Sequence, residues 1–161
     1  VRNALARVAA AAKRGCGGRA MQPRNLHLTL AFLGDTEPEQ MQSAVAAAGR
    51  VGVEPFQLRL DQFGFWKQGR ERGILWAGGD APLQLDALVA GLRGELADAG
   101  VKFDAKAFVP HVTLLRDARP PREPIVFERI LWQVTAFVLV ASEHDASGPL
   151  YRIAACPFGA G

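Results

Sequence analysis

The sequence is poor in cysteine and in histidine. Its two cysteines, Cys16 and Cys156, lack the spacing of a zinc site, and we expect two free thiols without a function. Its three histidines are His27, His111 and His144, and no two of them lie close together in the chain. No short-range metal motif is therefore present, and we expect neither a metal nor another cofactor.

Long hydrophobic runs are also absent. Every apolar stretch is interrupted well before the roughly 18 residues that a membrane span needs. No basic segment followed by an apolar one opens the chain, so we expect no signal peptide. With 49% hydrophobic and 22% charged residues, the composition is that of a soluble globular protein. We expect a single cytoplasmic domain over residues 1–161, with no membrane contact and no obligate protein partner.

Lysine is scarce as well, with 4 lysines against 15 arginines and a net charge of +3. Guanidinium groups match phosphate oxygens bidentately, so the arginine excess fits phosphate recognition. Codon usage in a GC-rich genome is the better explanation of the total count, so only arginines near the histidines carry weight. A charge of +3 permits binding of an RNA end but does not predict wrapping of long nucleic acid.

One short pattern, His-x-Thr inside an apolar strand-like run, occurs twice. His27 and Thr29 form the first copy, and His111 and Thr113 form the second. Residues two apart in a strand share a face, so each histidine projects beside its threonine while the flanking apolar residues face a core. The 84-residue separation of the copies, from position 27 to position 111, indicates an internal duplication.

The surroundings of the two copies resemble the 2H (two-histidine) phosphoesterase superfamily. Within it, the chain is most similar to the bacterial and archaeal RNA 2′,3′-cyclic phosphodiesterases, also called 2′-5′ RNA ligases. The resemblance is strongest in residues 23–34 and 110–116, is weaker in 74–78 and 137–142, and covers about 23–158. It implies an α+β fold of two pseudosymmetric lobes of antiparallel β-sheet with flanking helices and an active-site cleft between them.

The patterning along the chain also favours the α+β class, because strands and helices mix without regular βαβ alternation. Strands are expected at residues 26–33, 56–65, 74–77, 110–115, 125–134, 136–142 and 150–156, helices at 1–13, 37–50 and 82–99, and a basic loop at 67–73. The last helix should bury one apolar face and end at Gly100. Its apolar face comprises Leu85, Leu88, Val89, Leu92 and Leu96. Relatives usually begin with a strand before the first helix. We therefore expect a first strand to be missing before residue 1.

Two histidines on opposite sides of a phosphorus atom can open a cyclic phosphodiester without a metal. One removes a proton from water and the other delivers a proton to the departing sugar oxygen. The resemblance implies that His111 is the general base and His27 the general acid. The hydroxyls of Thr29 and Thr113 can donate to phosphate oxygens. The alternative is a pair of structural histidines beside threonines chosen for strand propensity.

Four further residues are candidates for substrate binding. Arg116 resembles an arginine that contacts phosphate in the family, although strand alternation places it opposite His111 unless the strand ends or bulges. Phe32 resembles an aromatic near the substrate base, although alternation points it toward the core. Phe65 and Trp66 can stack on bases. They lie in an aromatic and basic stretch that also holds Phe63, Lys67, Arg70 and Arg72, which core packing and a solvated loop explain equally well.

The predicted function is hydrolysis of RNA or oligonucleotide 2′,3′-cyclic phosphate ends, or of cyclic nucleotides, to a 2′-phosphate. The alternatives are ATP-independent 2′-5′ ligation in the same site, a small-molecule cyclic phosphodiesterase, and a binding module that holds a nucleotide without turnover. A metal site formed by all three histidines is possible from ligand type alone. No nucleotide-binding glycine loop or adenylated-lysine motif is evident, so ligation would not need ATP.

Overall fold

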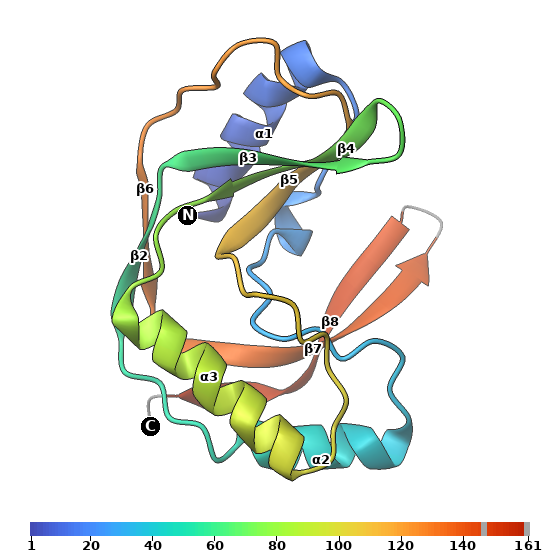
Figure 1. Ribbon diagram of the computed structural model, residues 1–161, viewed down its shortest axis with the longest axis vertical. Helices are drawn as coiled ribbons and strands as arrows, with labels where there is room; N and C mark the ends of the chain where they lie inside the picture. Colours follow the sequence, from blue (N-terminus) through green and yellow to red (C-terminus); the bar gives the residue numbers. More distant parts are fainter. Residues whose placement is uncertain (146–147, 160–161) are drawn as a thin grey trace. The chain divides into compact units, whose positions relative to one another are not determined.

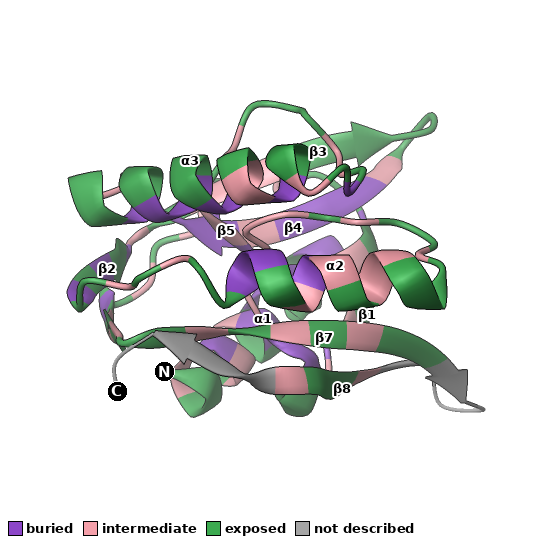
Figure 2. Ribbon diagram, turned by 90° about the horizontal axis from the view of Figure 1, so that it is seen from below, coloured by how far each residue is buried: buried purple, intermediate pink, exposed green. Residues whose placement is uncertain are grey.

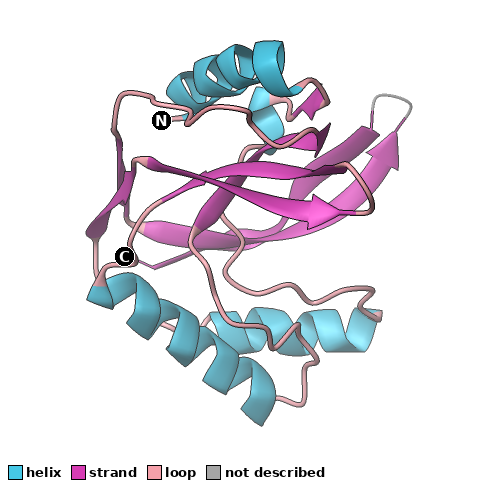
Figure 3. Cartoon of the chain, turned by 45° about the horizontal axis from the view of Figure 1, so that its top comes forward, coloured by secondary structure: helices cyan, strands magenta, loops and turns pink. Residues whose placement is uncertain are grey.

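The fold is taken from a computed structural model, which describes residues 1–145 and 148–159 and the side chains of residues 1–143 and 151–155. The chain divides into two compact units, each drawn from three separate segments. The first unit comprises Val1–Thr29, Leu58–Asp80 and Val109–Trp132, and the second comprises Leu30–Gln57, Ala81–Phe108 and Gln133–Gly161. Both units mix helices and strands (Figure 3).

The first unit contains a four-stranded antiparallel sheet in the order β1-β5-β4-β3, with helix α1 packed against β5 (Figure 1). The elements are α1 (Arg2–Cys16), β1 (Arg19–Ala20), the 3-10 turn η1 (Pro23–Asn25), β3 (Gln62–Gln68), β4 (Arg72–Gly78) and β5 (His111–Ala118). Strand β3 is therefore an edge strand, whereas β4 and β5 are central.

Helix and sheet bury matching faces in this unit. The buried residues of α1 recur at helical spacing and comprise Leu5, Ala9, Ala12 and Cys16. Those of β4 and β5 include Leu75, Ala77, Val112 and Leu114, all fully buried (Figure 2). Burial of apolar surface stabilises the fold by about 25 cal/mol per Å². The packing of α1 on β5 therefore holds the sheet in place, and the opposite face of the sheet is left for other side chains.

The second unit holds two helices, α2 (Pro38–Ala48) and α3 (Leu83–Asp98), and a ribbon of β7 (Ala136–Asp145) with β8 (Gly148–Gly159). Its core includes Ala44, Ala47, Leu92, Leu96 and Val101, with Leu30 and Leu33 packed against them. Helix α3 ends as its sequence predicts: Gly100 has a φ of 68°, and the Val101 amide donates to the Leu96 carbonyl at 2.9 Å.

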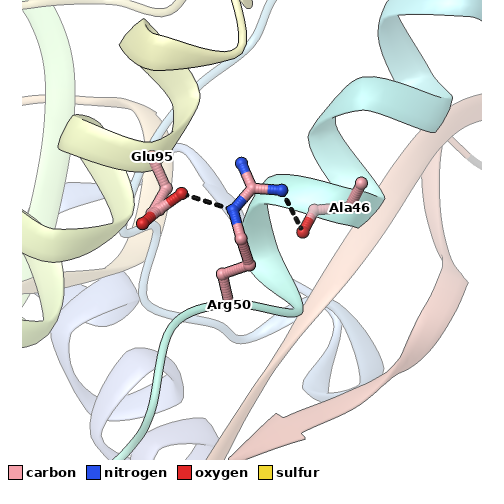
Figure 4. A network of polar contacts seen from close by, with 3 residues as sticks. All are labelled: Ala46, Arg50 and Glu95. Carbon is pink, nitrogen blue, oxygen red and sulfur yellow. Dashed lines mark hydrogen bonds and ion pairs between the residues drawn. The ribbon is translucent and has the colours of Figure 1, made fainter.

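A polar contact links the two helices of the second unit (Figure 4). Arg50 Nε donates to Glu95 Oε2 at 2.6 Å, and Arg50 Nη1 donates to the Ala46 carbonyl at 3.2 Å. Because the arginine side chain is half exposed, we expect this ion pair to stabilise the fold by no more than about 1 kcal/mol.

The remaining strands, β2 (Phe56–Leu60) and β6 (Ile130–Val134), pair in a separate two-stranded sheet. In the residues that the structure describes, antiparallel sheets combined with three α-helices confirm the predicted α+β class. No helix among the described residues is both long and apolar enough to cross a bilayer.

The predicted strand at residues 26–33 is wrong. Pro23 opens a 3-10 turn, and the only sheet pairing in this stretch is an isolated antiparallel bridge between Leu28 and Val112. After Thr29 the chain leaves the sheet because Leu30 and its apolar neighbours pack against the helices of the second unit. Hydrophobic alternation predicted the burial of Leu26 but not the exposure of Phe32 or the absence of a regular ladder.

Three other boundaries also differ from the prediction. The expected strand at 56–65 is broken at Asp61, whose amide donates to the Gly78 carbonyl, so β2 and β3 belong to different sheets. The expected loop at 67–73 is mostly hairpin, with its turn at residues 69–71. The strand expected from residue 125 begins only at Ile130, after a loop whose three prolines, Pro120, Pro121 and Pro124, lack backbone donors.

Candidate active site

Each motif histidine forms a hydrogen bond with the backbone carbonyl two residues before it. Nδ1 of His27 lies 2.7 Å from the Asn25 carbonyl, and Nδ1 of His111 lies 2.7 Å from the Val109 carbonyl. A carbonyl oxygen only accepts, so Nδ1 carries the hydrogen and donates it in both rings. Each neutral ring is therefore held in the tautomer that keeps Nε2 as the nitrogen that can take up a proton.

Sheet pairing brings the two motifs together within the first unit. The antiparallel bridge joins Leu28 to Val112, which are the central residues of the two His-x-Thr copies. Continuing this register by one residue each way places His27 opposite Thr113 and Thr29 opposite His111. The charge of His27 acts on the His111 ring, which also indicates that the two histidines lie near each other. The two histidines and their threonines therefore share one patch on the face opposite Leu28 and Val112.

Both threonines are half-buried on this patch. Among the residues that the structure describes, neither the Thr29 nor the Thr113 hydroxyl forms a hydrogen bond. A hydroxyl that is not used within the protein can donate to an anionic ligand. The patch therefore presents two proton-exchanging nitrogens and two neutral donors.

Two tryptophans cover His111. The ring of Trp66 meets the imidazole edge-to-face, with centroids 4.4 Å apart, and the ring of Trp76 lies 6.1 Å away. The two indoles contact each other at 5.1 Å. Gly64 makes this packing possible, because any side chain there would overlap the Trp76 ring. The Trp76 indole nitrogen is buried without a hydrogen-bond partner.

The enclosure of His111 changes its acidity. Burial lowers the pKa of His111 below its ordinary 6.5, because desolvation disfavours the charged ring. Positive charge on His27 lowers the pKa further, whereas the hydrogen bond to the Val109 carbonyl opposes both effects. His111 is therefore a neutral imidazole at pH 7, which is the form that accepts a proton.

A β-bulge returns Arg116 to the face of the histidines. Trp76 pairs with Thr113, whereas the residue before Trp76 pairs with Leu115, so Leu114 is an extra residue in β5. Leu114 and Leu115 are both fully buried. Alternation then places Arg116 on the Thr113 side of the sheet. Regular alternation would have placed Arg116 on the face opposite His111, and the bulge reverses this.

The three aromatic residues predicted to bind substrate lie in different places. Trp66 lies against His111 and is 37% exposed, which leaves part of its ring accessible. Phe65, its neighbour on β3, lies on the other face of the strand and lines a cavity with Lys67 and Arg70. Phe32 belongs to the second unit and is 64% exposed, so the core position that alternation indicated is wrong.

Sequence reasoning missed two features of this region. Trp76 was noted only as part of a strand, although its pairing with Gly64 across β3 and β4 creates the space for its ring. Arg119 and Arg122, in the loop after β5, line the cavity beside Phe65. The signal for the second feature was the arginine-rich and proline-rich composition of residues 116–124.

Potential metal ligands do not converge in the described part of the chain, where no three His, Cys, Asp or Glu side chains form a group. The side chains of His144 and Cys156, and with them the three-histidine metal site, lie outside the described residues. Cys16 is a buried free thiol on α1, and burial raises its pKa.

An α+β sheet that carries two backbone-anchored histidines has the arrangement of the 2H phosphoesterase class. The family model described as LigT-like phosphoesterase matches residues 1–76 and 79–151, and the chain belongs to this family. The chain is 34% identical to an RNA 2′,3′-cyclic phosphodiesterase of Thermus thermophilus, over 85% of this chain and 73% of the relative. It is also 34% identical to the enzyme of the same name from Thermotoga maritima, over 88% and 79%.

Solved structures agree with this assignment. The crystal structure of Escherichia coli LigT in its apo form superimposes with a TM-score of 0.79 at 30% identity, covering 99% of this chain and 91% of that one. The same protein complexed with 3′-AMP gives 0.79 at 31% identity, covering 98% and 90%. A Thermus thermophilus structure gives 0.80 at 32% identity with the same coverage.

Proposed function

We propose that this protein hydrolyses 2′,3′-cyclic phosphate ends of RNA or oligonucleotides to 2′-phosphates, without a metal or other cofactor. The observation that carries the proposal is the paired geometry of His27 and His111, each with Nδ1 hydrogen-bonded to a carbonyl two residues earlier. Relatives named RNA 2′,3′-cyclic phosphodiesterase support the substrate. The 3′-AMP complex of a structural neighbour supports recognition of a nucleotide. An RNA substrate also fits a cytoplasmic location.

The reaction requires one proton to leave water and one proton to reach the sugar. Nε2 of His111 accepts the proton of the attacking water as its oxygen bonds to phosphorus. The bond between phosphorus and O3′ breaks, and protonated His27 delivers a proton from Nε2 to that oxygen. The product carries the phosphate on O2′, and proton exchange with solvent restores both rings.

The low pKa of His111 supports its assignment as the base. A general base must be unprotonated before the reaction, and burial keeps the His111 ring neutral at pH 7. Thr29 and Thr113 would donate to the non-bridging phosphate oxygens, where negative charge develops. Arg116, on the same face through the bulge, would neutralise part of that charge.

The test uses an RNA that ends in a 2′,3′-cyclic phosphate, with EDTA present throughout. We expect the wild-type protein to produce a 2′-phosphate end. His27→Ala and His111→Ala should each lower kcat by roughly 10²-fold to 10⁴-fold, the range typical of a lost general acid or base. The products can be separated by chromatography and distinguished by phosphorus NMR.

His144→Ala is the matched control because it removes the histidine outside both motifs. We expect it to retain wild-type activity. If EDTA or His144→Ala abolishes turnover, a metal site is involved and the proposed mechanism is wrong. If the wild-type protein binds the RNA end but leaves it uncut, the protein is a binding module.

A further inference from the structure

The first unit contains a cavity of about 500 Å³ that the proposed mechanism does not use. It lies between the β3–β4 hairpin and the loop that follows β5, and is lined by Phe65, Lys67, Arg70, Glu71, Arg119, Pro120 and Arg122. Four of these residues are cations and one is an anion. The lining therefore carries a net charge of +3, as much as the entire chain.

The cations of this cavity have no acidic partner among the described side chains. Within the described part of the chain, Lys67, Arg70, Arg119 and Arg122 form no ion pair and no side-chain hydrogen bond. Bringing like charges together costs free energy, and a bound polyanion would offset this cost. Guanidinium groups suit phosphate oxygens in particular, because their fork geometry allows bidentate contacts.

Neighbouring residues of the edge strand β3 contact the cavity and the patch that holds His27 and His111. Trp66 contacts His111 on one face of β3, while its chain neighbours Phe65 and Lys67 line the cavity. In the described part of the chain, no further strand covers β3 on its outer side, since β3 ends the β1-β5-β4-β3 order. A polynucleotide with one base on Trp66 can therefore pass over this edge and bring an upstream phosphate to the arginines.

We propose that this cavity, which we call the hairpin pocket, binds the phosphodiester backbone of RNA upstream of the cyclic end. The proposal rests on the proposed function for the reacting end and adds a second contact for the rest of the strand. Phe65 offers an aromatic surface for a base, and the four cations bind the phosphates. The hairpin pocket thereby gives the protein a preference for RNA over cyclic mononucleotides.

The test compares three substrates with the same cyclic end: a mononucleotide, a dinucleotide and an octanucleotide. In the wild-type protein we expect KM to fall with length at similar kcat. Arg119→Ala/Arg122→Ala should raise KM for the octanucleotide roughly tenfold and leave the mononucleotide unchanged. The slope of log KM against log salt for the octanucleotide should decrease by about 1.4, since each lost single-strand phosphate contact contributes about 0.7.

Arg2→Ala/Arg7→Ala is the matched control, since it removes two exposed arginines of α1 that do not line the cavity. It should leave KM for every substrate near the wild-type value. Equal effects of the two double variants would show that only net charge matters, and would overturn the proposal. Equal loss of activity on the mononucleotide and the octanucleotide would also overturn it, because the arginines would then act on the reacting end or on folding.

A binding measurement separates this proposal from the proposed function. His27→Ala/His111→Ala is titrated with a fluorescent octanucleotide that ends in a 2′-phosphate. Adding Arg119→Ala/Arg122→Ala to this protein should weaken binding roughly tenfold whether or not the wild type cleaves RNA. Unchanged binding would exclude the hairpin pocket. Absence of cleavage by the wild type, with this difference in binding intact, would contradict only the catalytic proposal.

Discussion

At the scale of single residues, the two histidines of the site differ in their surroundings although they share a backbone contact. Trp66 and Trp76 enclose His111, and burial is the largest cause of its lowered pKa. Trp66 therefore acts on the proposed base through the environment of the ring, not through a hydrogen bond. This makes Trp66 a positioning residue as well as a candidate surface for a base.

The first prediction concerns Trp66→Leu. Removing the indole admits water to His111, so its pKa should rise toward 6.5. Because the base works only when unprotonated, the acidic limb of the kcat/KM profile should move to higher pH. Steady-state rates on a cyclic mononucleotide across the acidic range provide the measurement.

Trp132→Leu, which removes a half-buried indole of β6, is the control for this experiment and should leave the acidic limb in place. A limb that does not move in Trp66→Leu, or that moves to lower pH, would show that the indole does not desolvate the proposed base.

At the scale of elements, strand β5 combines two requirements that a regular strand cannot meet. Its buried side supports α1, while its other side carries His111, Thr113 and Arg116. A regular alternation would place position 116 on the buried side. The extra residue at Leu114 shifts the register by one and places Arg116 on the same face as His111 and Thr113.

The second prediction compares two glycine substitutions in different elements. Gly64→Ala on β3 places a methyl group inside the Trp76 ring, and we expect it to lower the free energy of unfolding by about 1–3 kcal/mol. Gly94→Ala lies inside α3, where nothing is within 4 Å of the added atom. It should raise the free energy of unfolding by roughly 0.5–1 kcal/mol, since alanine is the better helix former.

Urea titrations followed by tryptophan fluorescence test both glycine variants. If Gly64→Ala is as stable as the wild type, the indole can move aside, and the tight contact does not hold it over the sheet. Gly94→Ala serves as the matched control because it makes the same chemical change without a neighbouring ring.

At the scale of the whole molecule, the lowered pKa of His111 makes stability depend on pH. The folded protein keeps this ring neutral at a pH where the unfolded chain, with an ordinary pKa of 6.5, already binds a proton. The contribution of the neutral His111 ring to the free energy of unfolding is complete above pH 6.5. It is lost as the pH falls through the lower pKa of the folded state. Stability should therefore decrease on acidification through this window.

The third prediction is that His111→Gln reduces this pH dependence, because glutamine does not titrate. Global unfolding by urea at about pH 7.5 and about pH 5.5 measures the effect on both sides of the ordinary histidine pKa. The burial-raised pKa of Cys16 and the lowered pKa of Asp104 lie outside this window, since their ordinary values are 9.0 and 3.8. The same slope in wild type and His111→Gln would contradict the prediction.

The amino-acid sequence by itself determined the features that depend on local patterns. The two His-x-Thr copies identified His27 and His111, and helical periodicity predicted the buried face of α3, because side-chain direction repeats with fixed periods in helices and strands. The α+β class followed from the order of these elements. Even the end of α3 at Gly100 was readable, since only glycine readily adopts that backbone conformation.

Only the tertiary structure decided which distant segments meet. The bridge between Leu28 and Val112, the bulge at Leu114, the Trp76 ring over Gly64 and the convergence of Arg119 with Phe65 all depend on pairings between separate segments. A one-residue shift in such a pairing moves a side chain to the opposite face of the sheet, and the local sequence does not encode that shift. The motif therefore identified the candidate acid and base, whereas the packing of the sheet lowered the pKa of His111 and formed the basic cavity lined by Phe65 and Arg119.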